Sequence, residues 1–233
     1  MKNILVTGGS GTIGSAIVDT LIAHDYKVWV MDIKPPAEKR NQAYINCDIT
    51  RYDEIRSSLG SNFKDIKLDG LITVAGGALK GEWNDFSTTD IEVIKKSVEV
   101  NLLGHIYAVH AILPYLGESN NKSITMISSI NGMAAYRLAG YSASKAGLQG
   151  FMLGVAKELG KAGIRINLVS PGTVVTELTL RETKKDWNKL REGTLTGNFV
   201  CPEDIADLVL TIVRNQSIDG QNFIIDSGQL VKK

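Results

Sequence analysis

Tyr141 and Lys145 stand four positions apart in a stretch whose apolar spacing predicts a helix. Residues at this separation share one helix face, so the phenol and the ammonium can approach each other. A free phenol has a pKa of about 10. An ammonium about 4 Å away, at an effective dielectric of about 20, contributes about 4 kcal/mol, which corresponds to roughly three pKa units. The pair therefore predicts a tyrosine that serves as acid or base near neutral pH.

Ser129 and Asn101 precede this pair and could complete a proton-transfer site. A serine hydroxyl could hold a carbonyl or alcohol oxygen in place, as preorganised donors do at a developing charge. Each residue also has an ordinary interpretation. A Tyr–Lys pair is common on helix surfaces, Ser129 could end a strand, and Asn101 could be a polar helix residue. The chemical hypothesis depends on finding all of them in order on one framework.

A glycine-rich turn lies near the start of the chain. Residues 9–14 have the spacing G-x-G-x-x-G and lie between a predicted strand and a predicted helix. In that position, glycines let the backbone approach a pyrophosphate closely, and the helix N-terminus offers free N–H groups and a positive dipole end to the anion. The turn predicts a dinucleotide site, with a plain tight turn as the alternative.

Asp32 ends the second predicted strand, 18 residues after Gly14. An acid at this point can accept hydrogen bonds from the adenosine ribose hydroxyls, and it repels a 2′-phosphate. Asp32 therefore favours NAD over NADP. Lys34, two residues further on, could soften this discrimination, and a solvated loop acid is the alternative.

The rest of the chain alternates short apolar runs with longer helical patterns. The candidate strands are 3–7, 27–31, 43–46, 70–74, 123–128, 165–169 and 222–225, and the clearest helical stretches are 14–24, 89–116, 140–160 and 202–215. Alternation of this kind predicts βαβ units and a parallel sheet with helices on both faces. The predicted fold class is α/β, a doubly wound Rossmann-type parallel sheet of about seven strands.

Composition limits the function classes. The 233 residues suit one domain, 1–233, and a formal charge of +1 gives no broad attraction for nucleic acid or acidic membranes. Two isolated cysteines and three histidines without neighbours at ligand spacing predict neither a disulfide framework nor a metal site. No stretch is apolar enough to span a bilayer, and the first apolar run is too short for a secretion signal, so a cytoplasmic protein is expected.

Taken together, these motifs resemble the short-chain dehydrogenase/reductase family over essentially the whole chain. The residues that carry the resemblance are Thr7–Gly14, Tyr141-Ser142-Ala143-Ser144-Lys145, Asp48, Asn101, Ser129, Ser170-Pro171-Gly172 and the closing stretch 220–228, all in the expected order. Asp48 also has a local interpretation, because with Thr50 and Asp53 it could cap the next helix.

The resemblance implies a role for each site residue. Tyr141 is then the acid/base, Ser129 binds the reacting oxygen, and Lys145 grips the nicotinamide ribose while Asn101 helps a water relay protons to it. The implied cofactor-binding residues are Gly8, Ser10, Gly11, Thr12, Ile13, Gly14, Asp32, Ile33, Asp48, Ile49, Ala75, Gly76, Tyr141, Lys145, Pro171, Gly172, Val174 and Thr176.

Three features depart from the family's common pattern. Thr12 replaces a glycine of the classical turn, and the spacing Gly8, Gly11, Gly14 resembles the longer, sugar-nucleotide branch. The Asn-Asn-Ala-Gly motif becomes Thr-Val-Ala-Gly at 73–76, so the asparagines' polar contacts must be replaced or lost. Ser129 precedes Tyr141 by 12 residues, one fewer than is common, and Ser128 would restore the spacing; Ser129 is preferred because the Ser-x-x-Gly pattern ends at Gly132.

The function implied is an oxidoreductase that transfers a hydride between NAD, or alternatively NADP, and a small secondary alcohol or ketone. An NAD-using sugar-nucleotide epimerase or dehydratase and a non-catalytic cofactor-binding sensor are the alternatives. The long polar stretch 176–199 is the expected substrate loop or lid. The many small residues of 140–160, together with the resemblance, favour a homo-oligomer, a homotetramer before a dimer.

Overall fold

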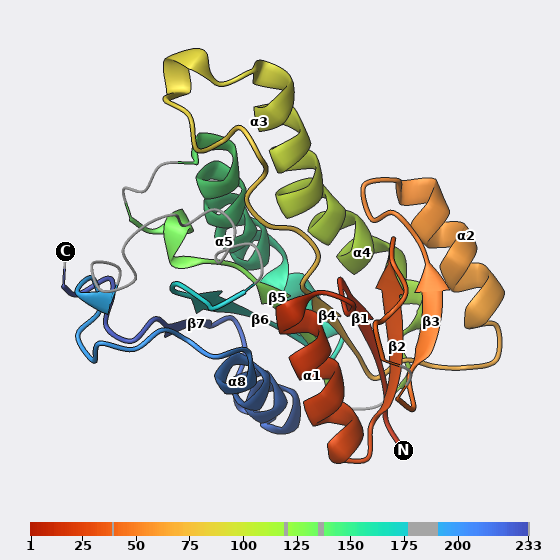
Figure 1. Ribbon diagram of the computed structural model, residues 1–233. Helices are drawn as coiled ribbons and strands as arrows, with labels where there is room; N and C mark the ends of the chain where they lie inside the picture. The colour runs from red at the N-terminus through yellow and green to blue at the C-terminus, as the bar shows by residue number, and fades with distance from the viewer. Residues whose placement is uncertain (39, 119–120, 135–137, 177–190, 233) are drawn as a thin grey trace.

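A computed structural model describes the chain except residues 39, 119–120, 135–137, 177–190 and 233 (Figure 1). Within the described residues, seven parallel strands form one sheet in the order β3-β2-β1-β4-β5-β6-β7. The strands are β1 (Asn3–Thr7), β2 (Lys27–Asp32), β3 (Ala43–Asn46), β4 (Gly70–Thr73), β5 (Lys122–Ile127), β6 (Ile164–Pro171) and β7 (Asn222–Ile225). The predicted doubly wound fold is confirmed. Its switch point lies between β1 and β4, where open α/β sheets bind ligands.

Helices cover both faces of the sheet (Figure 1). The helices are α1 (Thr12–Ala23), α2 (Tyr52–Asn62), α3 (Ile91–Val98), α4 (Gly104–Ile112), α5 (Ala139–Lys161) and α8 (Pro202–Arg214). On β1, Ile4 and Val6 pack with α1 and α8, whereas Leu5 between them packs with α2, α4 and α5. Because successive strand side chains point to opposite faces, a strand buried on both sides must be apolar throughout.

The predicted helix 89–116 is interrupted in the structure. It consists of α3, a π-helical turn over Glu99–Leu103, α4 and a short 3-10 turn over Leu113–Tyr115. Apolar periodicity does not reveal a π turn, since one turn of wider helix shifts the pattern by a single residue. Such turns occur frequently at functional sites, and this one contains the fully buried Asn101.

The local interpretation of Asp48 is only partly right: Asp48 bonds Thr50, but the N-cap of α2 is Arg51, which has no side-chain cap hydrogen bond. Its carboxylate accepts hydrogen bonds from the Thr50 N–H at 2.9 Å and the Thr50 hydroxyl at 2.8 Å. Glu54, in the first turn of α2, accepts the Asp48 N–H at 3.0 Å. Asp48 therefore shapes the entry to α2, a helix for which no bounds were predicted.

Of the predicted loop 176–199, only Thr176 and residues 191–199 lie within the described part. Val174 and Val200 on either side of it form a bridge. None of the helices that the structure describes is both long and apolar enough to cross a membrane.

Candidate functional site

The predicted site residues gather at one edge of the sheet. They follow β1 (Gly8, Ser10, Gly11, Thr12, Ile13, Gly14), end or follow β2 (Asp32, Ile33), follow β3 (Asp48, Ile49), β4 (Ala75, Gly76) and β5 (Ser129), and end or follow β6 (Pro171, Gly172, Val174, Thr176). All seven strands are parallel, so their carboxyl ends lie at the same edge. Asn101, Tyr141 and Lys145 come from helices beside it.

Two glycines of the turn are required by its geometry. Gly8 has a φ of +69° and packs so closely that a Cβ atom there would overlap the Ala75 backbone nitrogen. A Cβ on Gly14 would overlap the Gly8 carbonyl oxygen and lie 2.8 Å from the Gly9 Cα. The close packing of strand, turn and helix therefore depends on Gly8 and Gly14.

The start of α1 is open to an anion. Its N-cap, Gly11, has no side-chain cap, and the first turn of the helix contains no acidic residue. A Cβ on Gly11 would meet only the Gly8 carbonyl oxygen, at 3.5 Å. Unsatisfied N–H groups at a helix N-terminus attract phosphate, so the turn fits the pyrophosphate of a dinucleotide.

Asp32 is fixed across the glycine turn. One carboxylate oxygen accepts the Ser10 N–H at 3.1 Å, and the other accepts the Lys34 N–H at 3.1 Å. The Ser10 hydroxyl donates in turn to the Lys34 carbonyl at 2.7 Å. The acid is therefore oriented beside the turn before any ligand binds.

Ser129, Tyr141 and Lys145 come together at the carboxyl end of β5. The Ser129 side chain lies near enough to the Tyr141 phenol to lower its pKa, and the Lys145 Nζ lies 5.6 Å from the centre of the tyrosine ring. The same Nζ donates to the Ile127 carbonyl at 2.9 Å. Ser128 is used differently, because its hydroxyl donates to the Lys145 backbone carbonyl at 3.0 Å. Ser129 is thus the serine that meets the phenol.

The protonation of this pair differs from the sequence-based expectation. Burial raises the pKa of Tyr141, the Ser129 side chain lowers it, and the Glu82 carboxylate raises it again. Burial also lowers the pKa of Lys145 to about 7. The expectation that Lys145 alone brings the tyrosine near neutrality is wrong, because burial penalises both charged forms and leaves the lysine only partly protonated.

A lysine with a lowered pKa makes stability depend on pH. Burial disfavours the charged form of Lys145 and so lowers the free energy of unfolding. This destabilisation is fully present below about pH 7 and disappears above pH 10.5, the ordinary lysine pKa. We expect the stability gain from Lys145→Met to be larger at pH 6 than at pH 9, by about 2–3 kcal/mol. Urea unfolding at both pH values measures this difference. An equal change at both would contradict the lowered pKa.

Asn101 clamps the loop that follows β4. Its Oδ1 accepts the Gly77 N–H at 2.8 Å, and its Nδ2 donates to the Gly77 carbonyl at 3.0 Å. Gly76, with a φ of +125°, packs against this amide so closely that a Cβ would overlap Oδ1. The structure therefore gives Asn101 a positional role, and its part in a proton relay stays a prediction.

His105 is hydrogen-bonded to two residues of the altered Thr-Val-Ala-Gly motif. Its Nε2 lies 2.9 Å from the Ala75 carbonyl, which can only accept, so Nε2 carries the proton and Nδ1 accepts from the Thr73 hydroxyl at 2.6 Å. Burial, and then the nearby Lys145, lower the pKa of this histidine well below its usual value. Nothing in the local pattern of the sequence pairs His105 with Thr73, which lies 32 residues away.

Glu82 was also missed. It lies in the loop after β4, is only 2% exposed, and accepts the Tyr141 N–H at 2.7 Å. A single acid in a loop gives no sequence signal that separates it from a solvated one.

Comparison with known proteins gives full-length matches. Residues 2–187 match the family model described as short chain dehydrogenase. The chain is 32% identical over 239 residues to carbonyl reductase family member 4 from Xenopus laevis, with 97% of each chain covered. It is 28% identical to (+)-borneol dehydrogenase 1 from Salvia officinalis, covering 99% of this chain and 94% of that one. The ligand-free aldohexose dehydrogenase of Thermoplasma acidophilum has 25% identity and a TM-score of 0.91, with 99% of this chain and 94% of that chain covered.

Proposed function

The chain belongs to the short-chain dehydrogenase/reductase family, and on this premise we propose that it oxidises a secondary alcohol or reduces the matching ketone, with NAD preferred to NADP. One observation carries the proposal. The Ser129 side chain lies near enough to the Tyr141 phenol to lower its pKa, and the Lys145 Nζ lies 5.6 Å from the tyrosine ring, at the sheet edge that holds the glycine turn.

Each residue of the site has a separate role in the proposed reaction. When bound, the nicotinamide cofactor supplies the hydride for reduction and accepts it in oxidation. Tyr141 donates a proton to the carbonyl oxygen in reduction and removes one from the alcohol in oxidation. Ser129 donates a hydrogen bond to the same oxygen and orients it. Lys145, with a pKa of about 7, exchanges protons beside the tyrosine near neutrality.

The proposed cofactor contacts follow the sheet edge. The turn 8–14 and the open start of α1 would hold the pyrophosphate, and Asp32 would accept hydrogen bonds from the ribose hydroxyls. The stretches 48–49 and 75–76 would adjoin the adenosine, and 171–176 would adjoin the nicotinamide. Tyr141 and Lys145 would contact the nicotinamide ribose.

The cofactor preference can be tested at Asp32. Asp32→Asn keeps the shape and one acceptor oxygen but removes the charge that repels a 2′-phosphate. We expect the ratio of kcat/KM with NAD to kcat/KM with NADP to fall about 10- to 100-fold, the effect of losing a charged hydrogen bond. Steady-state kinetics with both cofactors measure it. The matched variant Lys34→Ala should shift the ratio toward NAD, and an unchanged ratio in Asp32→Asn would remove the basis for NAD preference.

A substrate panel tests the function itself. Secondary alcohols and ketones are offered with both cofactors, and nicotinamide absorbance is followed. Turnover with freely exchanging cofactor supports the proposal. Tightly retained NAD without net turnover would favour the epimerase or dehydratase, and binding without any turnover would favour a sensor. The 97% coverage of a carbonyl reductase supports the oxidoreductase over the longer, sugar-nucleotide branch.

The homotetramer and the cytoplasmic location stay predictions. Cβ atoms on Gly150 and Gly154 of α5 would meet nothing within 4 Å, and Leu153 between them is 60% exposed. A helix face of this kind supports close contact with a second subunit.

A further inference from the structure

The helix that carries Tyr141 begins without a cap of its own. Its N-cap is Leu138, which has a φ of +79° and supplies no side-chain hydrogen bond. The first N–H groups of a helix need acceptors from outside it, and an apolar residue in the left-handed region adds strain. Tyr141 lies in this first turn, so the direction of its side chain depends on what holds the turn.

Glu82 supplies the acceptor from another part of the chain. One oxygen of its buried carboxylate accepts the Tyr141 N–H at 2.7 Å. The other accepts the Leu79 N–H at 2.9 Å and the Ser97 hydroxyl at 3.0 Å. Gly140 permits this approach, because a Cβ there would lie 2.9 Å from the carboxylate. A negative charge at a helix N-terminus, with charge-assisted hydrogen bonds, is a favourable arrangement.

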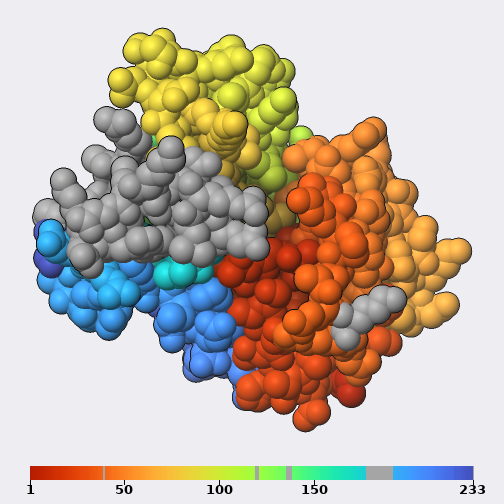
Figure 2. Space-filling view, viewed as in Figure 1, coloured from red at the N-terminus to blue at the C-terminus, as the bar shows by residue number. Residues whose placement is uncertain are grey.

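The same carboxylate connects Tyr141 to Asn101. The hydroxyl of Ser97, on α3, also lies 3.3 Å from the Asn101 Nδ2, and Asn101 in turn holds Gly77. Ser97 and Asn101 are fully buried. α3 and α5 lie side by side, and the segment before α3 stands out from the body of the molecule as a yellow lobe (Figures 1 and 2). Glu82 thus joins this lobe to the start of α5.

We propose that Glu82 is a positioning residue for Tyr141, whose carboxylate fixes the start of α5 against the loop after β4 and so aims the phenol at the substrate oxygen. The inference rests on the proposed function, which assigns the proton transfer to Tyr141. Glu82 acts through the backbone N–H of Tyr141 and through the electric field at the phenol. Lys145 on the same helix and Ser129 after β5 also face the phenol, and Lys145 acts electrostatically on His105 of α4.

The test is Glu82→Gln, which keeps the shape of the side chain but removes the charge and one acceptor. Because misplacing a reacting group by a fraction of an ångström is costly, we expect kcat to fall about 10- to 100-fold, with the cofactor KM within about twofold of the unmodified protein. In alcohol oxidation the rate rises as Tyr141 loses its proton. The Glu82 carboxylate raises the pKa of that phenol, so the rising limb should move to lower pH in the variant.

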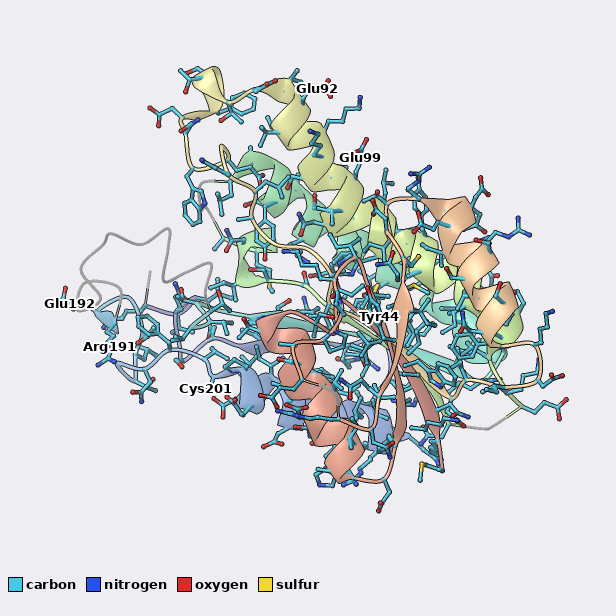
Figure 3. The ribbon with its side chains drawn as sticks, turned by 45° about the vertical axis from the view of Figure 1, so that its right-hand side comes forward. Tyr44, Glu92, Glu99, Arg191, Glu192 and Cys201 are labelled. Carbon is cyan, nitrogen blue, oxygen red and sulfur yellow. The ribbon has the colours of Figure 1, made fainter. Side chains whose placement is uncertain are left out.

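Glu92→Gln is the matched control. Glu92 is an exposed acid near the start of α3, where it pairs with Lys95 at the surface (Figure 3). The Glu92→Gln variant removes one negative charge from α3, the helix that carries Ser97, without touching the buried network, so its kcat and pH profile should equal those of the unmodified protein. A folded Glu82→Gln with unmodified kcat and pH profile would overturn the proposal, as would an equal pH shift in Glu92→Gln.

A double variant separates positioning from general damage. If Glu82 acts through Tyr141, adding Glu82→Gln to Tyr141→Phe should cost less than about twofold in kcat, because effects on one unit are not additive. A further full loss would indicate structural damage and overturn the proposal.

If Glu82→Gln does not fold, Ser97→Ala replaces it as the test variant. Ser97→Ala removes one donor to the carboxylate, and it should lower kcat while the rising limb of the pH profile stays at the same pH as in the unmodified protein. Unmodified kcat in folded Ser97→Ala would then overturn the proposal.

A measurement that needs no substrate distinguishes failure of the proposed function from failure of the link between Glu82 and Tyr141. The ultraviolet phenolate titration of Tyr141, read as the difference from Tyr141→Phe, needs no substrate. If no alcohol or ketone is turned over, the proposed function fails, while a phenol that titrates at lower pH in Glu82→Gln still supports the link between the two residues. An unchanged titration overturns that link.

Discussion

Tyr141→Phe should lower kcat/KM for the alcohol or ketone by about 10²- to 10⁴-fold, the usual contribution of a positioned acid or base. The substitution removes only the phenolic hydroxyl, the group whose pKa the Ser129 side chain lowers. The ring and its place beside the Lys145 Nζ are kept. Steady-state kinetics in both directions measure the loss, and fluorescence titration of the cofactor should show its affinity little changed.

Tyr52→Phe is the matched control for this prediction. The Tyr52 hydroxyl is hydrogen-bonded to the His110 Nδ1 at 2.6 Å, between α2 and α4. This variant loses a phenolic hydroxyl and a hydrogen bond worth about 1 kcal/mol, but it leaves the sheet edge intact. Activity should stay at the unmodified level. If Tyr141→Phe were as active as Tyr52→Phe, the assignment of the proton to Tyr141, and with it the proposed reaction, would be wrong.

Gly14→Ala should have the second largest effect, on stability and cofactor binding together. The added Cβ would overlap the Gly8 carbonyl oxygen, which is backbone and cannot swing aside. Overpacking of this kind costs about 1–3 kcal/mol or more, so the Tm should fall by roughly 5–10 °C. Movement of the turn would also displace the N–H groups that we propose receive the pyrophosphate. Thermal melts with and without NAD measure both losses.

Gly11→Ala is the matched control for Gly14→Ala, because it adds the same methyl group to the turn at a position with room for it. Gly11 has a φ of −81°, which alanine adopts freely, and its added Cβ would lie 3.5 Å from the Gly8 carbonyl oxygen. Without cofactor, the free energy of unfolding of Gly11→Ala should stay within about 0.5 kcal/mol of that of the unmodified protein. Equal melting of Gly14→Ala and Gly11→Ala would show that the turn relaxes around a side chain and that its tight packing is dispensable.

Much of the molecule could be predicted from sequence because the relevant signals are local. The two-sided burial of strands such as β1 produces continuous apolar runs, and the alternation with helices predicted the parallel sheet. The glycine turn and the Tyr141–Lys145 spacing are likewise set within a few residues. The carboxyl ends of parallel strands then meet at one edge, so the predicted residues gather there without further information.

Other features depend on segments far apart in the chain. Local spacing left Ser128 and Ser129 open, and only the packing of α5 on β5 brought Ser129 to the phenol. Periodicity also continued through the π turn that holds Asn101. No local pattern pairs His105 with Thr73, 32 residues away, because only the packing of α4 near the end of β4 brings the two side chains together.

Pattern and spacing in the sequence alone determined the fold class, the glycine-rich turn and the identity of the candidate acid/base. The tertiary structure alone decided how that acid/base is held and charged. Glu82 reaches the Tyr141 N–H across 59 residues of sequence, and burial raises the pKa of Tyr141 and lowers that of Lys145. The physical reason is that periodicity and motif spacing depend on neighbours in the chain, whereas buried hydrogen bonds and desolvation depend on neighbours in space.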